Sequence, residues 1–396
     1  MALKLKVILS LAVISSLVIS IQLPVHAANP DDGYPIGEPA PGRTCPSSDV
    51  GASTVSSHSG KTLVCTLING EKKWWIAGES LPSAPTPAKP GSATNSAPEI
   101  QYTPKYKLAA KSIAMMKIFE NVTYASKSPT QHLDIYMPKG VVRPPLLIWS
   151  HGGGFVMGDD DFMKFDESAK LLEVLTKNGI AVASINYRLA QEATFPAAGV
   201  DIKSAIRFLR ANASKYGYDS NKFATGGDSA GSYLALMAAI TGDQPSPFDD
   251  PTDPNSKVSA AVKAVIDLFG NVDFFEMSAN NVKYPCDQSK NPFPVADTKV
   301  HPWFGDTTDP KVQTAMKSGG LYPYLKNSTA LPTFYIFHGS DDCSVSFYDS
   351  KNLDKAVKAV NGKSNLKIVP GAIHGGAGVW SAVMKAVPEI KKSLTK

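Results

Sequence analysis

The sequence predicts an α/β domain with a doubly wound, mostly parallel sheet, preceded by a small disulfide-bridged β module. In residues 101–396, short apolar segments alternate with longer amphipathic ones, as strands and helices do in such a sheet. Two glycine-rich turns, residues 151–155 and 227–231, each follow an apolar segment, where parallel sheets bind their ligands. A Pro/Ala/Ser/Thr-rich stretch, residues 81–100, is expected to be a linker after the module, residues 28–80.

The first 27 residues have the pattern of a secretory signal peptide. Lys4 and Lys6 precede an apolar run over residues 7–21, and small residues surround a processing site after Ala27. We expect cleavage there and a secreted or cell-envelope protein with no stable membrane span, an uncleaved anchor being the alternative. The net charge of +5 is too small to favour a nucleic-acid partner.

The module has the signals of a small β structure. Asn69-Gly70 is a strong hairpin signal between two strand-like segments. A unit of this size buries little core, so a bridge between Cys45 and Cys65 is expected to stabilise it. Trp74 and Trp75 are either its core or a binding face for a cell-surface or polymer ligand.

The larger region contains the predicted strands and helices. The predicted strands, all short and either apolar or alternating, are residues 121–124, 132–138, 146–150, 180–185, 221–225, 261–268, 333–337 and 366–369. The predicted helices, which share a helical spacing of apolar residues or a run of helix formers, are residues 107–119, 165–178, 201–215, 232–240 and 351–360. The long aromatic-rich insertion, residues 270–331, is expected to cover the site and set its specificity.

The turn Gly227-Asp228-Ser229-Ala230-Gly231 reads G-x-S-x-G between a predicted strand and a predicted helix. In that context the motif is a sharp turn that lifts the serine hydroxyl out of the sheet, because the flanking glycines have no Cβ. Ser229 is therefore the candidate nucleophile. By itself the motif could equally be a turn of small residues between two elements.

The turn that begins at His151 contains three consecutive glycines. Glycines at a strand end leave backbone N–H groups free to bind the negative oxygen of a tetrahedral intermediate. H-G-G-G accompanies G-x-S-x-G in esterases. We therefore expect an oxyanion hole from the N–H groups of Gly153, Gly154 and Ala230, rather than a merely flexible loop.

Four segments together resemble the hormone-sensitive-lipase-like carboxylesterases of the α/β-hydrolase fold. They are His151-Gly152-Gly153-Gly154-Phe155, Tyr187-Arg188-Leu189, Phe195-Pro196-Ala197-Ala198 and Gly227-Asp228-Ser229-Ala230-Gly231. The resemblance runs from about residue 121 to the C-terminus, and Gln191 stands where the family usually has proline. It implies hydrolysis of a carboxylic ester through an acyl-enzyme, without a cofactor.

The chain order serine, acid, histidine directs attention to the segments after the last two predicted strands. The family's H-G-x-x-D-x-x-V spacing implies that Asp342 is the acid, with Asp341 as the alternative. His338, at the strand end, is expected to be structural. The segment around His374 resembles the family's G-x-x-H-G and implies that His374 is the base.

The remaining cysteines are expected to form a second bridge. Four cysteines in an exported chain favour disulfides, and Cys286 and Cys343 are left once the module's pair is set aside. Two buried, unpaired thiols are the alternative. No C-x-x-C pair is present and residues 249–253 lack the spacing of a calcium loop, so we expect no metal.

The sequence thus predicts an exported serine esterase whose substrate is a short-chain or carbohydrate-linked ester. One alternative is a secreted peptidase or acyltransferase with the same three residues. Another is a surface-binding protein that uses a hydrolase-like domain as a scaffold.

Overall fold

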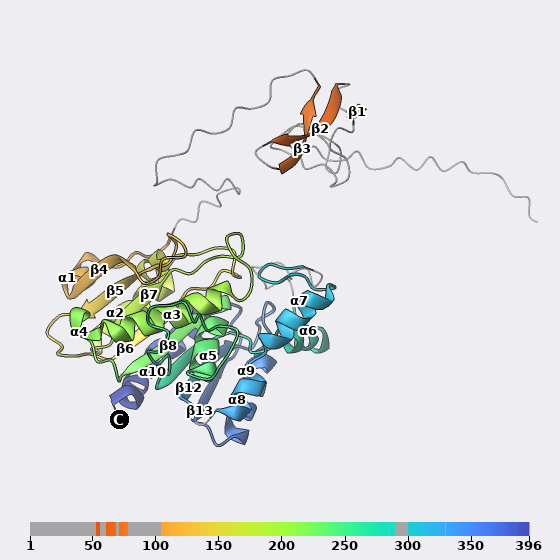
Figure 1. Ribbon diagram of the computed structural model, residues 1–396. Helices are drawn as coiled ribbons and strands as arrows, with labels where there is room; N and C mark the ends of the chain where they lie inside the picture. The colour runs from red at the N-terminus through yellow and green to blue at the C-terminus, as the bar shows by residue number, and fades with distance from the viewer. Residues whose placement is uncertain are drawn as a thin grey trace, which may run out of the picture. The chain divides into compact units, whose positions relative to one another are not determined.

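The computed structural model describes residues 53–55, 61–68, 71–77, 104–284, 286–287, 289, 300–328 and 330–395. The chain divides into two units, residues 1–100 and 101–396, which are described separately (Figure 1). The predicted signal peptide and linker lie outside the described residues. Within the described ranges, no helix has the length and hydropathy needed to cross a membrane.

The first unit contains a three-stranded antiparallel sheet. Its strands are β1 (Ser53–Val55), β2 (Thr62–Ile68) and β3 (Glu71–Ile76), paired in that order. Leu63, Cys65 and Trp74 form its buried core, so Trp74 belongs to the interior of the module. Cys45, the expected partner of Cys65, lies outside the described residues, as does the side chain of Trp75.

The second unit is built on an eight-stranded sheet, which confirms the predicted fold class. Its strands, in spatial order, are β13 (Ser364–Val369), β12 (Thr333–Gly339), β9 (Ala264–Leu268), β8 (Phe223–Asp228), β6 (Leu146–Ser150), β7 (Ala181–Ile185), β5 (His132–Pro138) and β4 (Met116–Thr123). The pairs from β13 to β7 are parallel, whereas β5 runs antiparallel to both of its neighbours. The sheet is therefore mostly parallel, and β5, next to the edge strand β4, is its one reversed strand.

Helices cover both faces of this sheet (Figure 1). They are α1 (Ala110–Ala114), the 3₁₀ helix η1 (Asp160–Lys164), α2 (Asp166–Lys177), α3 (Ala197–Ala211), α4 (Ala213–Tyr216), α5 (Ala230–Thr241), α6 (Phe274–Lys283), α7 (Pro310–Ser318), α8 (Tyr322–Asn327), α9 (Phe347–Ala359) and α10 (Ala377–Thr395). In β6, Leu146 and Ile148 pack in the core that includes α3 and α5, whereas Leu147 and Trp149 pack in the core that includes α2 and α10. Successive strand residues thus face opposite layers, as expected for a strand buried on both sides.

The helix predicted for residues 107–119 is wrong over most of its length. Only Ala110–Ala114 is helical, and Met116–Thr123 forms the edge strand β4. Pairing with β5 decides the outcome, because it places Phe119 opposite Ile135 in the sheet. The apolar spacing that suggested a helix does not mark a buried face, since Ile113 is 43% exposed.

The insertion between β9 and β12 contains α6, α7, α8 and a two-stranded ribbon. The strands of this ribbon are β10 (Val300–His301) and β11 (Gly305–Asp306). The aromatic residues of the insertion, among them Phe274, Trp303 and Phe304, are buried in the same core as α5. The insertion is thus part of the folded unit and packs beside the start of the helix that follows Ser229.

Candidate active site

The candidate residues meet at one edge of the sheet because each follows the carboxyl end of a parallel strand. Ser229 comes directly after β8 and His151 directly after β6. Asp342 follows β12 and His374 follows β13, each on a short loop. This edge is where doubly wound sheets bind their ligands.

The turn at Ser229 has the strained geometry that its motif predicts. Ser229 has φ 51° and ψ −120°, in the positive-φ region that non-glycine residues rarely occupy. A Cβ on Gly227 would collide with the carbonyl of Gly231, and one on Gly231 would collide with the carbonyl of Ser150. Both glycines are therefore required by close backbone contacts, and the Ser229 N–H is held by Leu268 O at 2.9 Å.

Three side chains form a continuous hydrogen-bonded chain. His374 Nε2 lies 3.0 Å from Ser229 Oγ, and His374 Nδ1 lies 2.7 Å from Asp342 Oδ2. Because Nδ1 faces a carboxylate, it carries the proton and Nε2 is left to accept from the serine hydroxyl. This is the order and polarity of a serine nucleophile, its base and an orienting acid.

Asp342 is held as a carboxylate by every group around it. Its Oδ1 accepts hydrogen bonds from the backbone N–H groups of Ser344 and Val345, both at 2.9 Å. Burial alone would raise the pKa of Asp342, but the charge of His374 and hydrogen bonds from His338 and His374 hold that pKa well below its usual range. Asp342 can therefore stay ionised beside the imidazole.

Asp341, the alternative acid, has a different environment. It is half-buried, and its Oδ1 accepts a hydrogen bond from Ser340 Oγ at 2.8 Å. Its backbone N–H donates to Ala372 O at 3.0 Å, which joins the acid loop to the loop of His374. The carboxylate on His374 Nδ1 is that of Asp342.

A second imidazole also binds the acid. His338 Nε2 lies 3.1 Å from Asp342 Oδ2 and 2.9 Å from Val345 O, while Nδ1 lies 2.7 Å from Ser350 Oγ. Nε2 faces two acceptors and so carries a proton. Burial would lower the pKa of His338, but the hydrogen bond and charge of Asp342 raise it above its usual value. The sequence predicts a structural role for His338, and the structure shows in addition that His338 and His374 share Asp342 Oδ2.

The glycine loop lies directly against the serine turn. A Cβ on Gly152 would collide with the carboxylate of Asp228, so these two segments touch. Gly153 and Gly154 have positive φ values of 101° and 61°. In the described part of the chain, the N–H groups of Gly153, Gly154 and Ala230 donate no hydrogen bond to the protein. Three backbone donors near the serine turn are thus left for a ligand.

Contacts between Tyr187 and His151 support this loop. The Tyr187 hydroxyl donates to His151 O at 2.8 Å, and the two rings stack with centroids 4.3 Å apart. His151 is fully buried, and burial lowers its pKa to about 4, so it is neutral. The next residue, Arg188, binds Asp201 through its backbone N–H and its guanidinium group. The Y-R-L segment therefore fixes the loop that carries the free donors.

Gln191 also contacts this loop. Its side-chain amide donates to Val156 O at 2.8 Å, two residues after the last glycine. This contact shows what the residue at the unusual position does in this chain, which the sequence alone did not indicate.

Aromatic rings fill the space beside the glycine loop. Phe155 stacks on Trp303 with ring centroids 4.4 Å apart and an interplanar angle of 12°. Tyr233, on the helix that follows Ser229, packs against Phe274 at 4.7 Å and donates a hydrogen bond to Gly319 O at 2.8 Å. The insertion therefore contributes buried rings on the side of the site where Phe155 lies.

The structure contains a disulfide between Cys286 and Cys343, residues 57 positions apart. It ties the insertion to the loop that follows Asp342. Asn281 reinforces this link, since its side chain donates to Ser344 O and accepts from the N–H of Ser346, both at 3.1 Å. The acid loop is thus fixed to α6 by two hydrogen bonds and to the segment after α6 by one covalent bond.

Comparisons with known proteins agree with this geometry. Esterase LipC of Mycobacterium tuberculosis is 28% identical over 251 residues, covering 62% of this chain and 57% of LipC. Isoprenylcysteine alpha-carbonyl methylesterase ICME of Arabidopsis thaliana is 24% identical over 261 residues, covering 65% of this chain and 56% of ICME. The chain thus spans a little over half the length of these curated relatives.

Solved structures show the same architecture. A truncated form of carbohydrate esterase from gut microbiota superposes with a TM-score of 0.60 and 26% identity, covering 72% of this chain and 100% of that chain. Butyrate-bound esterase 2 of Thermogutta terrifontis is 20% identical and superposes with a TM-score of 0.53, covering 71% of this chain and 94% of that chain. It shares the fold.

The family assignment rests on a match that spans most of the second unit. The family model BD-FAE matches residues 133–357, a range that contains the glycine loop, the serine turn and the acid. The matched range, the esterase relatives and the sheet agree with the resemblance to hormone-sensitive-lipase-like carboxylesterases. The chain belongs to the BD-FAE family and has the α/β-hydrolase fold.

Proposed function

We propose that this protein is a serine carboxylesterase in which Ser229, His374 and Asp342 act as nucleophile, base and orienting acid. The observation that carries the proposal is the hydrogen-bonded chain from Ser229 Oγ through both ring nitrogens of His374 to Asp342 Oδ2. Its position beside unused backbone donors suits acyl transfer, which needs a nucleophile and a site for negative charge together.

In the first half-reaction, His374 Nε2 takes the hydroxyl proton while Ser229 Oγ attacks the ester carbonyl carbon. The carbonyl oxygen becomes negative and is stabilised by the N–H groups of Gly153, Gly154 and Ala230. Asp342 accepts from Nδ1–H and stabilises the imidazolium. The intermediate collapses by breaking the bond to the alcohol, which leaves with the proton from Nε2.

In the second half-reaction, a water molecule gives a proton to Nε2 and attacks the acyl-enzyme carbonyl. Collapse returns the proton to Ser229 Oγ and releases the carboxylic acid. The same donors stabilise the negative oxygen in both halves. Neither step calls for a cofactor.

We further propose that the ester has a short acyl group or is linked to carbohydrate. What supports a short acyl group is that the rings of Phe155 and the fully buried Trp303 pack together and so fill space beside the glycine loop. What supports carbohydrate is the similarity to a structure described as a carbohydrate esterase. Export, followed by binding of a polymer or cell-surface ligand through the N-terminal module, would bring the enzyme to such a substrate.

A panel of substrates tests this proposal against its rivals. Acetate and longer-chain p-nitrophenyl esters, acetylated sugars and matched peptide amides would be compared with wild-type protein and with Ser229→Ala. We expect turnover of short esters and acetylated sugars that is lost in the variant. Faster cleavage of the amides would favour a peptidase, and no turnover of any substrate would favour a scaffold.

A further inference from the structure

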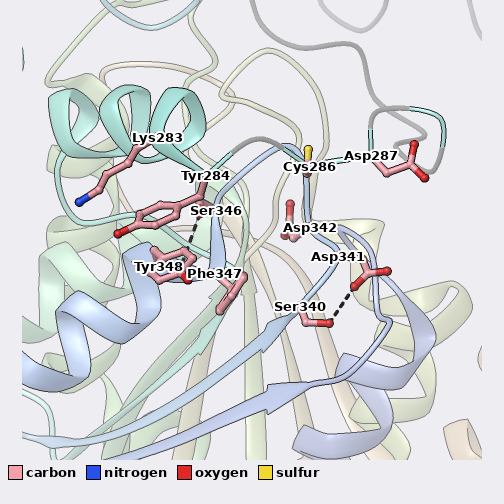
Figure 2. A pocket seen from close by; sticks show the side chains of 10 residues that line it. All are labelled: Lys283, Tyr284, Cys286, Asp287, Ser340, Asp341, Asp342, Ser346, Phe347 and Tyr348. Atoms are coloured by element: carbon pink, nitrogen blue, oxygen red, sulfur yellow. Dashed lines mark hydrogen bonds between the residues drawn. The ribbon is translucent and has the colours of Figure 1, made fainter.

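A cavity of about 530 Å³ lies beside the acid loop (Figure 2). Asp342 is one of its lining residues, whereas Ser229 and His374 are not. Its volume falls in the range of sites that bind small molecules. The cavity is thus large enough for a ligand of its own and contacts the catalytic groups only through the acid.

One wall of this cavity is aromatic. Tyr284, which ends α6, and Tyr348, in the first turn of α9, stack with ring centroids 3.5 Å apart and an interplanar angle of 10°. The ring of Phe347 packs at 4.5 Å from that of Tyr348. All three rings are half-buried, so part of each remains accessible. Rigid rings at a surface supply contact area at little cost in conformational entropy.

The wall is held in place by the contacts that join α6 to the acid loop. The Cys286–Cys343 disulfide and the side chain of Asn281 connect these two segments on the same side of the cavity. Tyr284 lies between Asn281 and Cys286 in the chain, and Tyr348 lies five residues after Cys343. Because the linked residues are so near, the two rings are preorganised before a ligand arrives. Preorganisation lowers the free-energy cost of binding.

Figure 2 shows the carboxylate of Asp341 across the cavity from the rings, beside the hydroxyl of Ser340, and Asp287 also lines the cavity. Two lysines lie on the aromatic side, with Lys283 Nζ 5.1 Å from the ring centre of Tyr284 and Lys351 Nζ 4.8 Å from that of Tyr348. With Asp342, three carboxylates and one lysine, Lys283, line the cavity, and Lys351 lies beside Tyr348, so the cavity does not favour an anionic ligand. An acyl chain in this space would press hydrocarbon against carboxylates and remove water from them, which is unfavourable.

We propose that this cavity is a subsite for a neutral sugar unit of a carbohydrate-linked ester, with the scissile bond of the same molecule at Ser229. A sugar offers apolar C–H groups to the accessible parts of the rings and hydroxyl groups that donate to the carboxylates. The inference rests on the proposed esterase function. An imidazole ring and two hydrogen bonds separate Asp342 from Ser229, so a ligand must extend past the His374 ring to occupy both places.

The test uses the full chain and the variants Tyr284→Ala and Tyr348→Ala. We would measure kcat/KM for acetylated xylo-oligosaccharides of increasing length and for p-nitrophenyl acetate. The ratio of the two should fall about tenfold in each variant for the longest oligosaccharides, the size expected for loss of one aromatic contact. Phe275→Ala is the matched control, because Phe275 is an exposed ring on α6 that does not line the cavity. It should leave the ratio unchanged.

An unchanged ratio in both tyrosine variants, or an equal fall for both substrates, would overturn the subsite. A second measurement separates this failure from failure of the proposed function. Calorimetry with deacetylated xylo-oligosaccharide and the Ser229→Ala protein reports binding without chemistry. Binding that is lost in Ser229→Ala/Tyr284→Ala supports the subsite even if no ester is turned over, whereas absence of binding, or binding that survives Tyr284→Ala, contradicts it.

Discussion

Replacing Asp342 by asparagine should damage catalysis far more than replacing Asp341. In Asp342→Asn the backbone N–H groups of Ser344 and Val345 still require an acceptor, so the amide oxygen stays on them. The amide nitrogen then faces His374 Nδ1. Because that nitrogen donates, it favours the tautomer with the proton on Nε2, which cannot accept from Ser229.

The expected loss in kcat is about 10³–10⁴-fold, the size seen when the acid of such a triad becomes an amide. Asp341→Asn retains the acceptor for Ser340 Oγ, so its loss should be less than about threefold. The assay is kcat for p-nitrophenyl acetate near neutral pH, with circular dichroism to verify that both variants are folded. A larger loss in Asp341→Asn, or losses of equal size, would refute the assignment of the acid.

Four further outcomes follow from the structure. His338→Gln should lower kcat about tenfold with little change in KM, because one hydrogen bond to a charged group that positions Asp342 is lost; a change confined to KM would contradict this role. Because the pKa of Asp342 is lowered in the folded state, ionised Asp342 stabilises the fold at pH values above its usual pKa of 3.8. The difference in free energy of unfolding between wild type and Asp342→Asn, measured in denaturant titrations, should therefore shrink as the pH falls below about 4 and through the lower folded-state pKa. A difference that grows would contradict it. Replacing Cys286 and Cys343 by serine should lower the free energy of unfolding by about 4 kcal/mol and lower activity, and unaltered stability would count against the bridge. Mass spectrometry of the exported protein should give a chain that begins at or near Ala28, whereas a mass that includes the first residues would indicate an anchored form.

The parts of the fold that follow from local chemistry could be predicted from the sequence. The buried strand at residues 146–150 was visible as a continuous apolar run bounded by prolines and glycines. The strained turn at Ser229 could be recognised from Gly227 and Gly231, because the close backbone contacts of such a turn exclude a Cβ at both positions. The edge strand β4 was missed, since its identity depends on pairing with β5 and its apolar spacing is ambiguous over a short segment.

The site was predicted where residue order and motif spacing suffice, and missed where contacts come from distant segments. The order serine, acid, histidine pointed to the three side chains that the structure brings together. The contact of His338 with the acid depends on how the loop after β12 turns back, which no local pattern specifies. The stack of Tyr284 on Tyr348 joins the residue after α6 to the first turn of α9 and likewise has no sequence signature.

Reaction with a fluorophosphonate probe tests the central claim most directly, because the probe modifies a serine only when its hydroxyl is activated. Peptide mapping by mass spectrometry of the labelled native protein should find the phosphonyl group on Ser229. His374→Ala should slow labelling by several orders of magnitude while the protein stays folded. A native protein that takes up no label, or that takes it up on another residue, would contradict the account.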